Sequence, residues 1–555
     1  MKKLTLLING LLAVTMLNAQ PPPFQWAQGI GGISNDQGRA IAVDASGNVY
    51  TAGYFIGNVD FDPGPGQSNL TSYANSPDIF ILKLNASGSF AWVKRIGGLS
   101  ADLVNSMVID PSGNIYTTGT FQGTVDFDPG PGSLSLISAG MSDIFVTKLD
   151  ASGNFIWAKK IGGINQEEAY SIAVDDAGNV CTTGGFTDTL DFNPGPGVTN
   201  LIARGGLAAF ILKLNSSGNF VWARSMDGDS SVANGTALKF DVSGNIHTTG
   251  NFYGSIDLDP GLDTFNVASD SWGDIFVLKL DSLGNFVWGK NIGLEESKSI
   301  TLDVAGDIYV TGSFSGQIFV AKIDVTGNTI WTKILSVIAT TGMDMSKGHS
   351  IVADESGHIY ITGEFNGKVD FDPGAGTYSL TAPSQYIFYP RSDAFILKLD
   401  SDGYFQWAKQ MGSEFDDAGL SLALDSWDNI YTTGHFFGTA DFNPDTGIFN
   451  LTAADSTSRD LFIQKLGQVT TVDLNENIRG DNFLIYPNPN NGIINLDLKT
   501  NTRVIVSNTI GQEILNQLRP PGIQQLNVQE QDGGVYFIQL ISDNKISVTK
   551  KIIKH

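Results

Sequence analysis

Pairs of acidic or amide side chains two residues apart recur along the chain and are its clearest candidates for chemistry. In the first pair, Asp60 and Asp62 flank Phe61 and precede a Pro-Gly-Pro-Gly turn. Residues two apart on an extended chain point to one face, so each pair presents its oxygens together. The pairs are Asp60 and Asp62, Asp126 and Asp128, Asp191 and Asn193, Asp257 and Asp259, Asp370 and Asp372, and Asp441 and Asn443.

Paired hard oxygens beside a glycine turn suit Ca²⁺, which takes about six to eight such ligands. The aspartates of these pairs are therefore candidate Ca²⁺ ligands, and Ca²⁺ is the one cofactor that the sequence suggests. The spacing is not that of an EF-hand loop, however, and two carboxylates per loop are few for a cation. The sequence favours the alternative, in which the second Asp or Asn caps a turn and the intervening Phe is buried.

Residue sets typical of catalysis are missing from the sequence. The histidines His247, His349, His358, His435 and His555 share no metal-ligand spacing, and no Gly-x-Ser-x-Gly or His-Glu-x-x-His motif occurs. Acidic pairs able to act as general acid and base recur in copy after copy, which indicates structure rather than one active centre. We therefore predict a protein without catalytic residues that acts as a binding or interaction module. The alternative is an extracellular hydrolase or lyase that acts on polysaccharide with acidic residues at its centre.

A repeated Phe-x-Trp motif, which is Thr-x-Trp in one copy, divides the chain into the repeats that contain these pairs. It returns seven times, at Trp26, Trp92, Trp157, Trp222, Trp288, Trp331 and Trp407. Between the tryptophans, short runs rich in Val, Ile, Tyr and Thr alternate with Asp-x-Ser-Gly-Asn turns, which predicts four antiparallel strands per copy. The strands of one copy are Ser106–Asp110, Ile115–Phe121, Asp143–Leu149 and Phe155–Lys159. We expect the periodic aromatic rings to pack in the core.

Seven copies of four strands predict an all-β fold, a seven-bladed β-propeller. The last copy stops at Leu466 without a Phe-x-Trp strand, whereas the chain begins with a spare one at 24–28. We therefore predict that the N-terminal strand completes the last blade and closes the ring. The fifth copy lacks the acidic loop between its second and third strands, which predicts a notch beside Gln317.

The repeated phrases Asp-x-x-Gly-Asn-x-Tyr-x-Thr-Gly and Asp-x-Phe-x-x-Lys-Leu resemble the SBBP family of β-propeller repeats. The resemblance covers about residues 24–467 and implies a propeller fold.

Both ends of the chain differ from the repeats. Residues 1–19 combine Lys2 and Lys3 with a short apolar run and a small residue at the expected cleavage position, which predicts a secretory signal. No other run is long and apolar enough to span a membrane. We expect the propeller over 20–467, a linker over 468–482 and a small β-sandwich over 483–555.

The tail resembles the type A C-terminal sorting domain of the type IX secretion system. The motif residues are Tyr486, Pro487, Asn488, Pro489, Gly492, Gly511, Gly534, Tyr536, Lys550 and Lys551. The resemblance implies export through the periplasm of a Gram-negative bacterium, with the secretion machinery as partner. The product would be secreted or attached to the outer cell surface.

Charge and cysteine content narrow the remaining partners. The net charge is −24, and because the signal and the tail are both net positive, the propeller and linker together are more negative still. Such a body repels nucleic acid and anionic lipid, so we expect a monomer whose partner is an extracellular glycan or protein.

The single cysteine, Cys181, excludes an intrachain disulfide and is interpreted as a buried filler.

The long connections between strands predict where a partner binds. Connections between second and third strands and between blades lie on one rim, and they include the acidic loops and an aromatic insertion with Tyr386, Phe388 and Tyr389. Variable loops on a rigid scaffold commonly carry binding. We therefore predict that this rim contacts the partner.

Overall fold

The computed structural model describes most of the chain. The described residues are 21–270, 273–339, 345–383, 391–445, 447–467, 484–486, 493–498, 501–508, 513–529, 531, 534–542 and 545–554. The chain divides into two compact units, Met1–Gln468 and Val469–His555. The predicted signal and the whole predicted linker lie outside the described residues.

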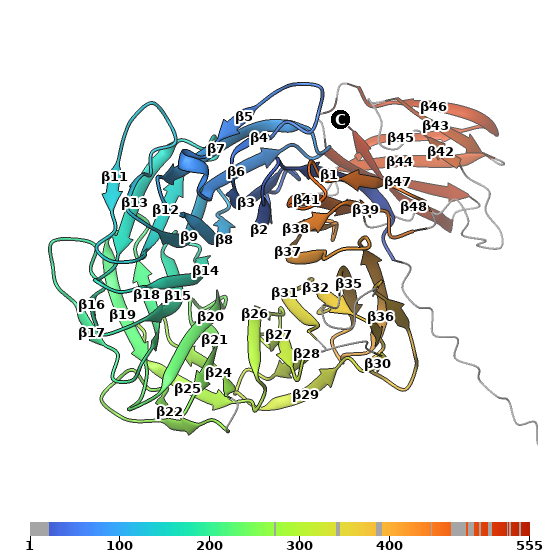
Figure 1. Ribbon diagram of the computed structural model, residues 1–555. Helices are drawn as coiled ribbons and strands as arrows, with labels where there is room; N and C mark the ends of the chain where they lie inside the picture. Colours follow the sequence, from blue (N-terminus) through green and yellow to red (C-terminus); the bar gives the residue numbers. More distant parts are fainter. Residues whose placement is uncertain are drawn as a thin grey trace, which may run out of the picture. The chain divides into compact units, whose positions relative to one another are not determined.

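The first unit is the predicted seven-bladed propeller, a ring of seven antiparallel blades of four strands each (Figure 1). Six blades are separate four-stranded sheets, and the sheet of blade 1 is extended to six strands by a short hairpin of blade 2. Within each blade the strands follow one another from the axis outward. Blade 1 contains β2 (Gln37–Val43), β3 (Val49–Phe55), β6 (Asp78–Leu84) and β7 (Phe90–Gly98); blade 2 contains β8 (Leu103–Ile109), β9 (Ile115–Phe121), β12 (Asp143–Leu149) and β13 (Phe155–Ile161); blade 3 contains β14 (Glu168–Val174), β15 (Val180–Phe186), β18 (Ala208–Leu214) and β19 (Phe220–Met226). Blade 4 contains β20 (Val232–Phe240), β21 (Ile246–Tyr253), β24 (Asp274–Leu280) and β25 (Phe286–Asn291); blade 5 contains β26 (Glu296–Leu302), β27 (Ile308–Phe314), β28 (Gln317–Ile323) and β29 (Thr329–Ile334); blade 6 contains β31 (Lys347–Ala353), β32 (Ile359–Asn366), β35 (Ser392–Leu399) and β36 (Phe405–Met411); blade 7 contains β37 (Ala418–Leu424), β38 (Ile430–Phe437), β41 (Arg459–Leu466) and β1 (Phe24–Ile30).

The N-terminal strand closes the ring, as the sequence predicts. β1 pairs antiparallel with β41, from Phe24 opposite Leu466 to Ile30 opposite Leu461. The Gly467 N–H also donates to the Pro23 carbonyl at 2.9 Å. The first and last segments of the propeller therefore share one sheet.

The core lies between neighbouring blades. One buried cluster combines Tyr50 and Ile79 of blade 1 with Phe121 and Phe145 of blade 2. The repeated tryptophans pack across the same boundaries, because an added Cβ on Gly88 of blade 1 would meet the Trp26 ring at 2.9 Å. Trp157, Trp222 and Trp407 are at most 9 % exposed. The expected core role of these rings is confirmed.

Each acidic loop is a short hairpin between the second and third strands of its blade. The hairpins are β4 (Asn58–Asp60) with β5 (Asn69–Thr71), β10 (Thr124–Asp126) with β11 (Ser135–Ile137), β16 (Thr189–Asp191) with β17 (Asn200–Ile202), β22 (Ser255–Asp257) with β23 (Asn266–Ala268), β33 (Lys368–Asp370) with β34 (Ser379–Thr381), and β39 (Thr439–Asp441) with β40 (Asn450–Thr452). In blade 5, β27 leads directly into β28, as predicted. β30 (Val337–Ala339), which follows blade 5, pairs with β33 of blade 6. The short helical turn η1 (Tyr73–Asn75) follows β5, and the described residues contain no α-helix.

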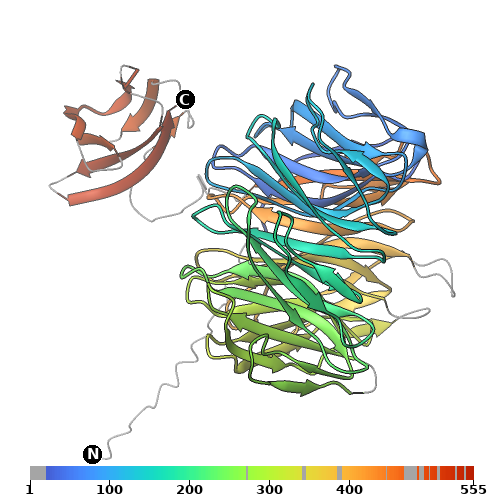
Figure 2. The same ribbon diagram turned by 90° about the vertical axis from the view of Figure 1, so that its left-hand side faces the viewer.

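The second unit has two sheets around one core (Figure 2). One sheet contains β42 (Leu484–Tyr486), β43 (Ile493–Leu498) and β46 (Gly522–Asn527); the other contains β45 (Glu513–Arg519), β44 (Thr502–Asn508), β47 (Gly534–Ser542) and β48 (Lys545–Lys554). Ile494 and Leu496 of the first sheet share a buried cluster with Val504 and Ile538 of the second. This is the architecture of a small β-sandwich. Within the described parts of both units, no helix is long and apolar enough to cross a membrane.

Candidate ligand site at the propeller axis

A β-bulge interrupts the inner strand of each blade at the same position. At this point the register between the first and second strands shifts by one, which leaves one inner-strand residue without a partner. The bulge residues are Arg39, Asn105, Tyr170, Thr236, Lys298, His349 and Leu420. Bulges re-aim side chains and are frequent beside functional sites.

Repeated serines beside the bulges join neighbouring blades. The residue after the bulge is serine in five blades, and each Oγ accepts the backbone N–H of the next inner strand at 3.2 or 3.3 Å. The bonds run from Ser106 to Ile172, Ser171 to Leu238, Ser299 to Ile351, Ser350 to Leu422 and Ser421 to Ile41. This serine belt explains why these positions repeat, because each one stabilises an interface between blades.

The bulge residues differ in every blade, and so does a second position beside them. That position follows the repeated glycine of the second strand and holds Tyr54, Thr120, Gly185, Asn251, Ser313, Glu364 and His435. Within each of these two groups no amino acid occurs twice. We call the two groups together the axial set, because they lie on or beside the strands that surround the axis (Figure 1).

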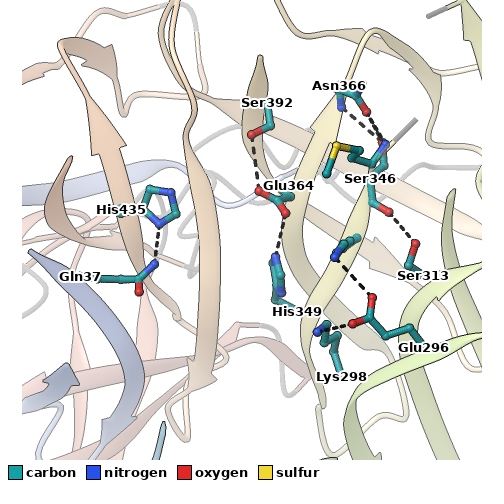
Figure 3. Close-up of polar contacts among 12 residues, drawn as sticks. Gln37, Glu296, Lys298, Ser313, Ser346, His349, Glu364, Asn366, Ser392 and His435 are labelled. Atoms are coloured by element: carbon teal, nitrogen blue, oxygen red, sulfur yellow. Dashed lines mark hydrogen bonds and ion pairs between the residues drawn. The ribbon is translucent and has the colours of Figure 1, made fainter. Parts of the chain in front are cut away.

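Blades 5 and 6 contribute ion pairs at the axis. Glu296 lies 2.6 Å from Lys298 Nζ and 3.4 Å from Lys347 Nζ. Burial alone would raise the pKa of Glu296, but the hydrogen bond and charge of Lys298, with Lys347, lower it overall. Figure 3 shows Glu296 and Lys298 near His349 and Glu364, the contact described next.

His349 and Glu364 form the second contact on blade 6. The His349 Nε2 atom lies 3.4 Å from Glu364 Oε1, and the Ser392 hydroxyl donates to Oε2 at 3.5 Å (Figure 3). Burial acts to raise the pKa of Glu364, but His349 outweighs it and the pKa is lowered. The two side chains are 17 % and 26 % exposed, so solvent reaches both. An imidazole against a carboxylate in this position can exchange a proton with a ligand.

Blades 7, 1, 2 and 3 are joined by a chain of neutral and cationic contacts. Gln37 Nε2 lies 2.9 Å from His435 Nδ1, and Gln37 Oε1 accepts from Arg39 Nε at 3.2 Å. Arg39 also donates to Asn105 Oδ1 at 2.7 Å, and Asn105 donates to the Ala169 carbonyl at 2.9 Å. Burial, followed by the charge of Arg459, lowers the pKa of His435 to about 3. His435 is therefore a neutral hydrogen-bonding group at neutral pH.

The acidic pairs act as turns. Asp60 Oδ1 accepts the backbone N–H groups of Asp62 at 3.1 Å and Ser68 at 2.7 Å. Asp62 Oδ1 accepts from Gly64 N at 2.8 Å, and Phe61 is fully buried. The other loops repeat these bonds, including those in which Asn193 and Asn443 take the second place. The turn interpretation is confirmed. Among the described residues no three His, Cys, Asp or Glu side chains gather as a metal site needs, and Ca²⁺ binding by the pairs stays a prediction.

Several predicted residues lie outside the described part of the chain. These are the partner-binding candidates Tyr386, Phe388 and Tyr389, and Pro487, Asn488, Pro489, Gly492 and Gly511 of the sorting motif. The remaining motif residues lie on strands: Tyr486 on β42, Gly534 and Tyr536 on β47, and Lys550 and Lys551 on β48. Tyr536 packs in the core of the second unit. Cys181 is fully buried, as expected, and burial raises the pKa of its thiol, which makes it a poor nucleophile.

The sequence interpretation missed the axial set, although the sequence contains a signal for it. The phrase Thr-Gly-x-Phe is repeated in the second strand, and its third residue changes from copy to copy. The opposite rim also contains a cavity of about 440 Å³ between the short turns of blades 4, 5 and 6, near Asp241, Asp303 and Asp354. These carboxylates bond the backbone of their own turns, so we place the candidate site at the axial set.

Two family profiles match the chain. The profile described as "Secretion system C-terminal sorting domain" matches residues 484–555. The profile described as "Beta-propeller repeat" matches residues 25–58 and 91–120.

Curated relatives and solved structures match the chain at low identity. An uncharacterized WD repeat-containing protein of Acanthamoeba polyphaga mimivirus is 23 % identical over 526 residues, covering 78 % of this chain and 37 % of the relative. The regulatory protein FlaEY of Caulobacter vibrioides is 23 % identical over 181 residues, covering 33 % and 18 %. The chain thus spans well under half the length of these relatives. Among solved structures, PorZ of Porphyromonas gingivalis has a TM-score of 0.31 at 12 % identity, with 95 % of this chain and 75 % of PorZ covered. The RRP9 WD40 repeats give a TM-score of 0.42 at 10 % identity, with 80 % and 99 % covered.

Proposed function

Because the chain carries SBBP-type β-propeller repeats and a type IX sorting domain, we propose that it is an extracellular binding module whose ligand lies at the propeller axis. The sorting domain directs the protein to type IX export, which delivers it outside the cell or to the cell surface. The secretion machinery recognises the second unit. The propeller is the part that remains available to bind.

The variability of the axial set is the observation that supports a ligand site. The serine belt and the buried tyrosines repeat from blade to blade because they hold the ring together. A pure scaffold would repeat the neighbouring axial positions as well, since each has the same backbone environment. Different side chains at equivalent positions instead build one asymmetric surface, and binding sites on repeat folds need such a surface.

Binding can be tested with the secreted full-length protein on glycan and protein arrays. We expect a ligand whose binding is lost in His349→Ala and Lys298→Ala, because both side chains belong to the axial set. The matched control is Val242→Ser, which changes a fully exposed residue on the opposite rim. Equal loss in the control, or no binder on either array, would contradict the proposal.

A hydrolase or lyase is the second candidate function, and the contact between His349 and Glu364 favours it. Among the described residues of the axial set, this is the one hydrogen-bonded contact between a histidine and a carboxylate, and it is partly open to solvent, as a general acid and base must be. A polysaccharide panel assayed for released reducing ends or unsaturated products tests it. Turnover by the native protein that Glu364→Gln abolishes would establish an enzyme. If no polysaccharide of the panel yields product, the hydrolase or lyase function is rejected and the binding module remains.

Export depends on the second unit in this proposal. Deleting residues 469–555 should trap the propeller in the periplasm while its melting temperature stays unchanged, because the two units have separate cores. Cell fractionation followed by thermal melting measures both effects. Fusing 469–555 to an unrelated periplasmic protein is the complementary experiment, and we expect that fusion to leave the cell. Normal export of the truncated chain would remove the role of the sorting domain.

A further inference from the structure

Arg39 is a cation at the axis with no ion-pair partner among the described residues. Its guanidinium is instead held by the neutral oxygens of Gln37 and Asn105. The Tyr54 ring lies against it, with its centroid 5.4 Å from Cζ. By contrast, Lys298 and Lys347 are both ion-paired with Glu296.

The charge of the Glu168 carboxylate acts on Arg39, but the hydrogen bonds of Glu168 go to other side chains. Gln166 donates to Glu168 Oε1 at 2.6 Å, and the Tyr170 hydroxyl donates to Oε2. Burial of Arg39 lowers its pKa, yet an arginine side chain keeps its charge in proteins. The guanidinium is therefore a partly desolvated positive charge, a costly arrangement unless an anion completes it.

Arg459 brings a second guanidinium to the same part of the ring. It begins β41, and its backbone is joined to the segment before β2: the Asp36 N–H donates to the Arg459 carbonyl at 2.8 Å, and Asn35 Oδ1 accepts from Arg459 N at 3.2 Å. The Arg459 Nε atom is buried and has no hydrogen-bond partner within the described part of the chain. The charge of Arg459 acts on both Arg39 and His435. Arg459 thus lies on the blade 7 side of the seam where the first and last blades join, and Arg39 lies on the blade 1 side.

We infer that an oxyanion binds at the seam between blades 7 and 1, at Arg39 of the axial set and at Arg459 of β41, and that the ligand is the carboxylate or sulfate group of an acidic saccharide. The inference rests on the proposed binding function and names its ligand class. Planar guanidinium groups present paired N–H donors that match the oxygens of such anions. The neutral groups of Asn105, which accepts from Arg39, and His435, which contacts Gln37, suit sugar hydroxyls, since ligand sites combine one charged anchor with a few polar groups.

The net charge of the protein restricts the size of the ligand. At −24 the body of the protein repels an extended polyanion, whereas the seam offers two local cations. We therefore expect recognition of a single charged residue, such as the end of an acidic chain. Nucleic acid does not fit this arrangement.

Calorimetry on the secreted full-length protein tests the inference with three probes: sodium galacturonate, galactose 6-sulfate and neutral galactose. We expect one or both charged probes to bind, more weakly at high salt, and galactose to bind at least about tenfold more weakly. Arg39→Gln and Arg459→Gln should each weaken the charged probe by about tenfold or more. Arg39→Lys should fall in between, because it keeps the charge and loses the planar fork. Lys368→Gln, which removes an exposed cation elsewhere on the propeller, should bind like the native protein.

The outcomes separate this inference from the proposed function. The carboxylate and the sulfate are distinguished by which charged probe binds. Charged and neutral sugars that bind equally, or arginine variants that bind like the native protein, overturn the oxyanion site even if array ligands still depend on His349. Thermal melting shows whether each variant is folded, and if Arg39→Gln does not fold, Arg459→Gln carries the test.

Discussion

At the scale of single residues, the bulge is a position at which the side chain differs from blade to blade although the fold repeats. A residue in the regular ladder must fit the same neighbours in every blade, as the serine belt does. The bulge residue has no partner across the ladder, so its identity is free to vary. Arg39, Lys298 and His349 occupy one such backbone position, so equivalent positions of three blades present different side chains to a ligand.

The acidic pairs provide a prediction at the same scale. Asp62→Asn should leave the melting temperature unchanged, because Asn193 and Asn443 make the same turn bond in their own loops. Asp62→Ala removes the acceptor for Gly64 N–H and should cost about 1 kcal/mol of stability. Thermal melting with and without Ca²⁺ measures both variants. A Ca²⁺-dependent rise in the native protein that Asp62→Asn abolishes would show instead that the pair binds metal.

The turns and buried rings could be predicted from the sequence, whereas the axial set could not. Asx turns and buried phenylalanines follow from local chemistry, so Asp62 and Phe61 were assigned correctly. The direction of Arg39 depends on the register between β2 and β3, and pairing between strands fixes that register. The alternation of apolar and polar residues in a seven-residue strand does not reveal a one-residue shift. His349 and Glu364 are also far apart in sequence from the axial residues of blades 7 and 1, so the sequence does not show that these residues share one axis.

At the scale of elements, the acidic hairpins also hold neighbouring blades together. β10 of blade 2 pairs with the end of β7 of blade 1, with Val125 opposite Gly98 and Asp126 opposite Gly97. Asp257 and Asp441 make single bridges of the same kind to the preceding blades. Loops that the sequence suggested as binding elements therefore also stabilise the ring, which leaves the axial set as the better-supported site.

At this scale we predict that strand β1 stabilises the closed ring. Deleting residues 21–30 removes the outer strand of blade 7 and exposes the edge of β41. It also removes Trp26, which packs on Gly88 of blade 1. We expect one cooperative transition at a much lower temperature, since the seam between blades 7 and 1 opens. An unchanged transition would mean that β1 has no structural role.

At the scale of the whole propeller, buried carboxyl groups lie at or just before the first residues of strands in several blades. Burial raises the pKa of Asp36, Asp78, Asp102 and Asp417 to about 7 and that of Asp393 to about 8. Asp460 is raised to about 6 for the same reason. Glycine faces several of them, because a Cβ on Gly97 or Gly412 would overlap the carboxyl of Asp78 or Asp393. These groups keep their protons in the folded ring at pH values where the unfolded chain has lost them.

This difference predicts that the propeller is more stable at pH 5 than at pH 7.5. A carboxyl whose pKa is raised from about 3.9 to about 7 contributes stability in full below pH 4 and loses it as the pH rises to 7. His247 and His435, with pKa values lowered by burial to about 4 and about 3, oppose this trend below pH 6.5. The six raised carboxyls outnumber them, so the melting temperature should rise on acidification. Asp78→Asn and Asp393→Asn mimic the protonated groups and should flatten the profile, with Asp62→Asn, at an exposed turn, as the unchanged control. A melting temperature that falls between pH 7.5 and pH 5, or variants with the native slope, would show that these carboxyls are ionised in the folded ring.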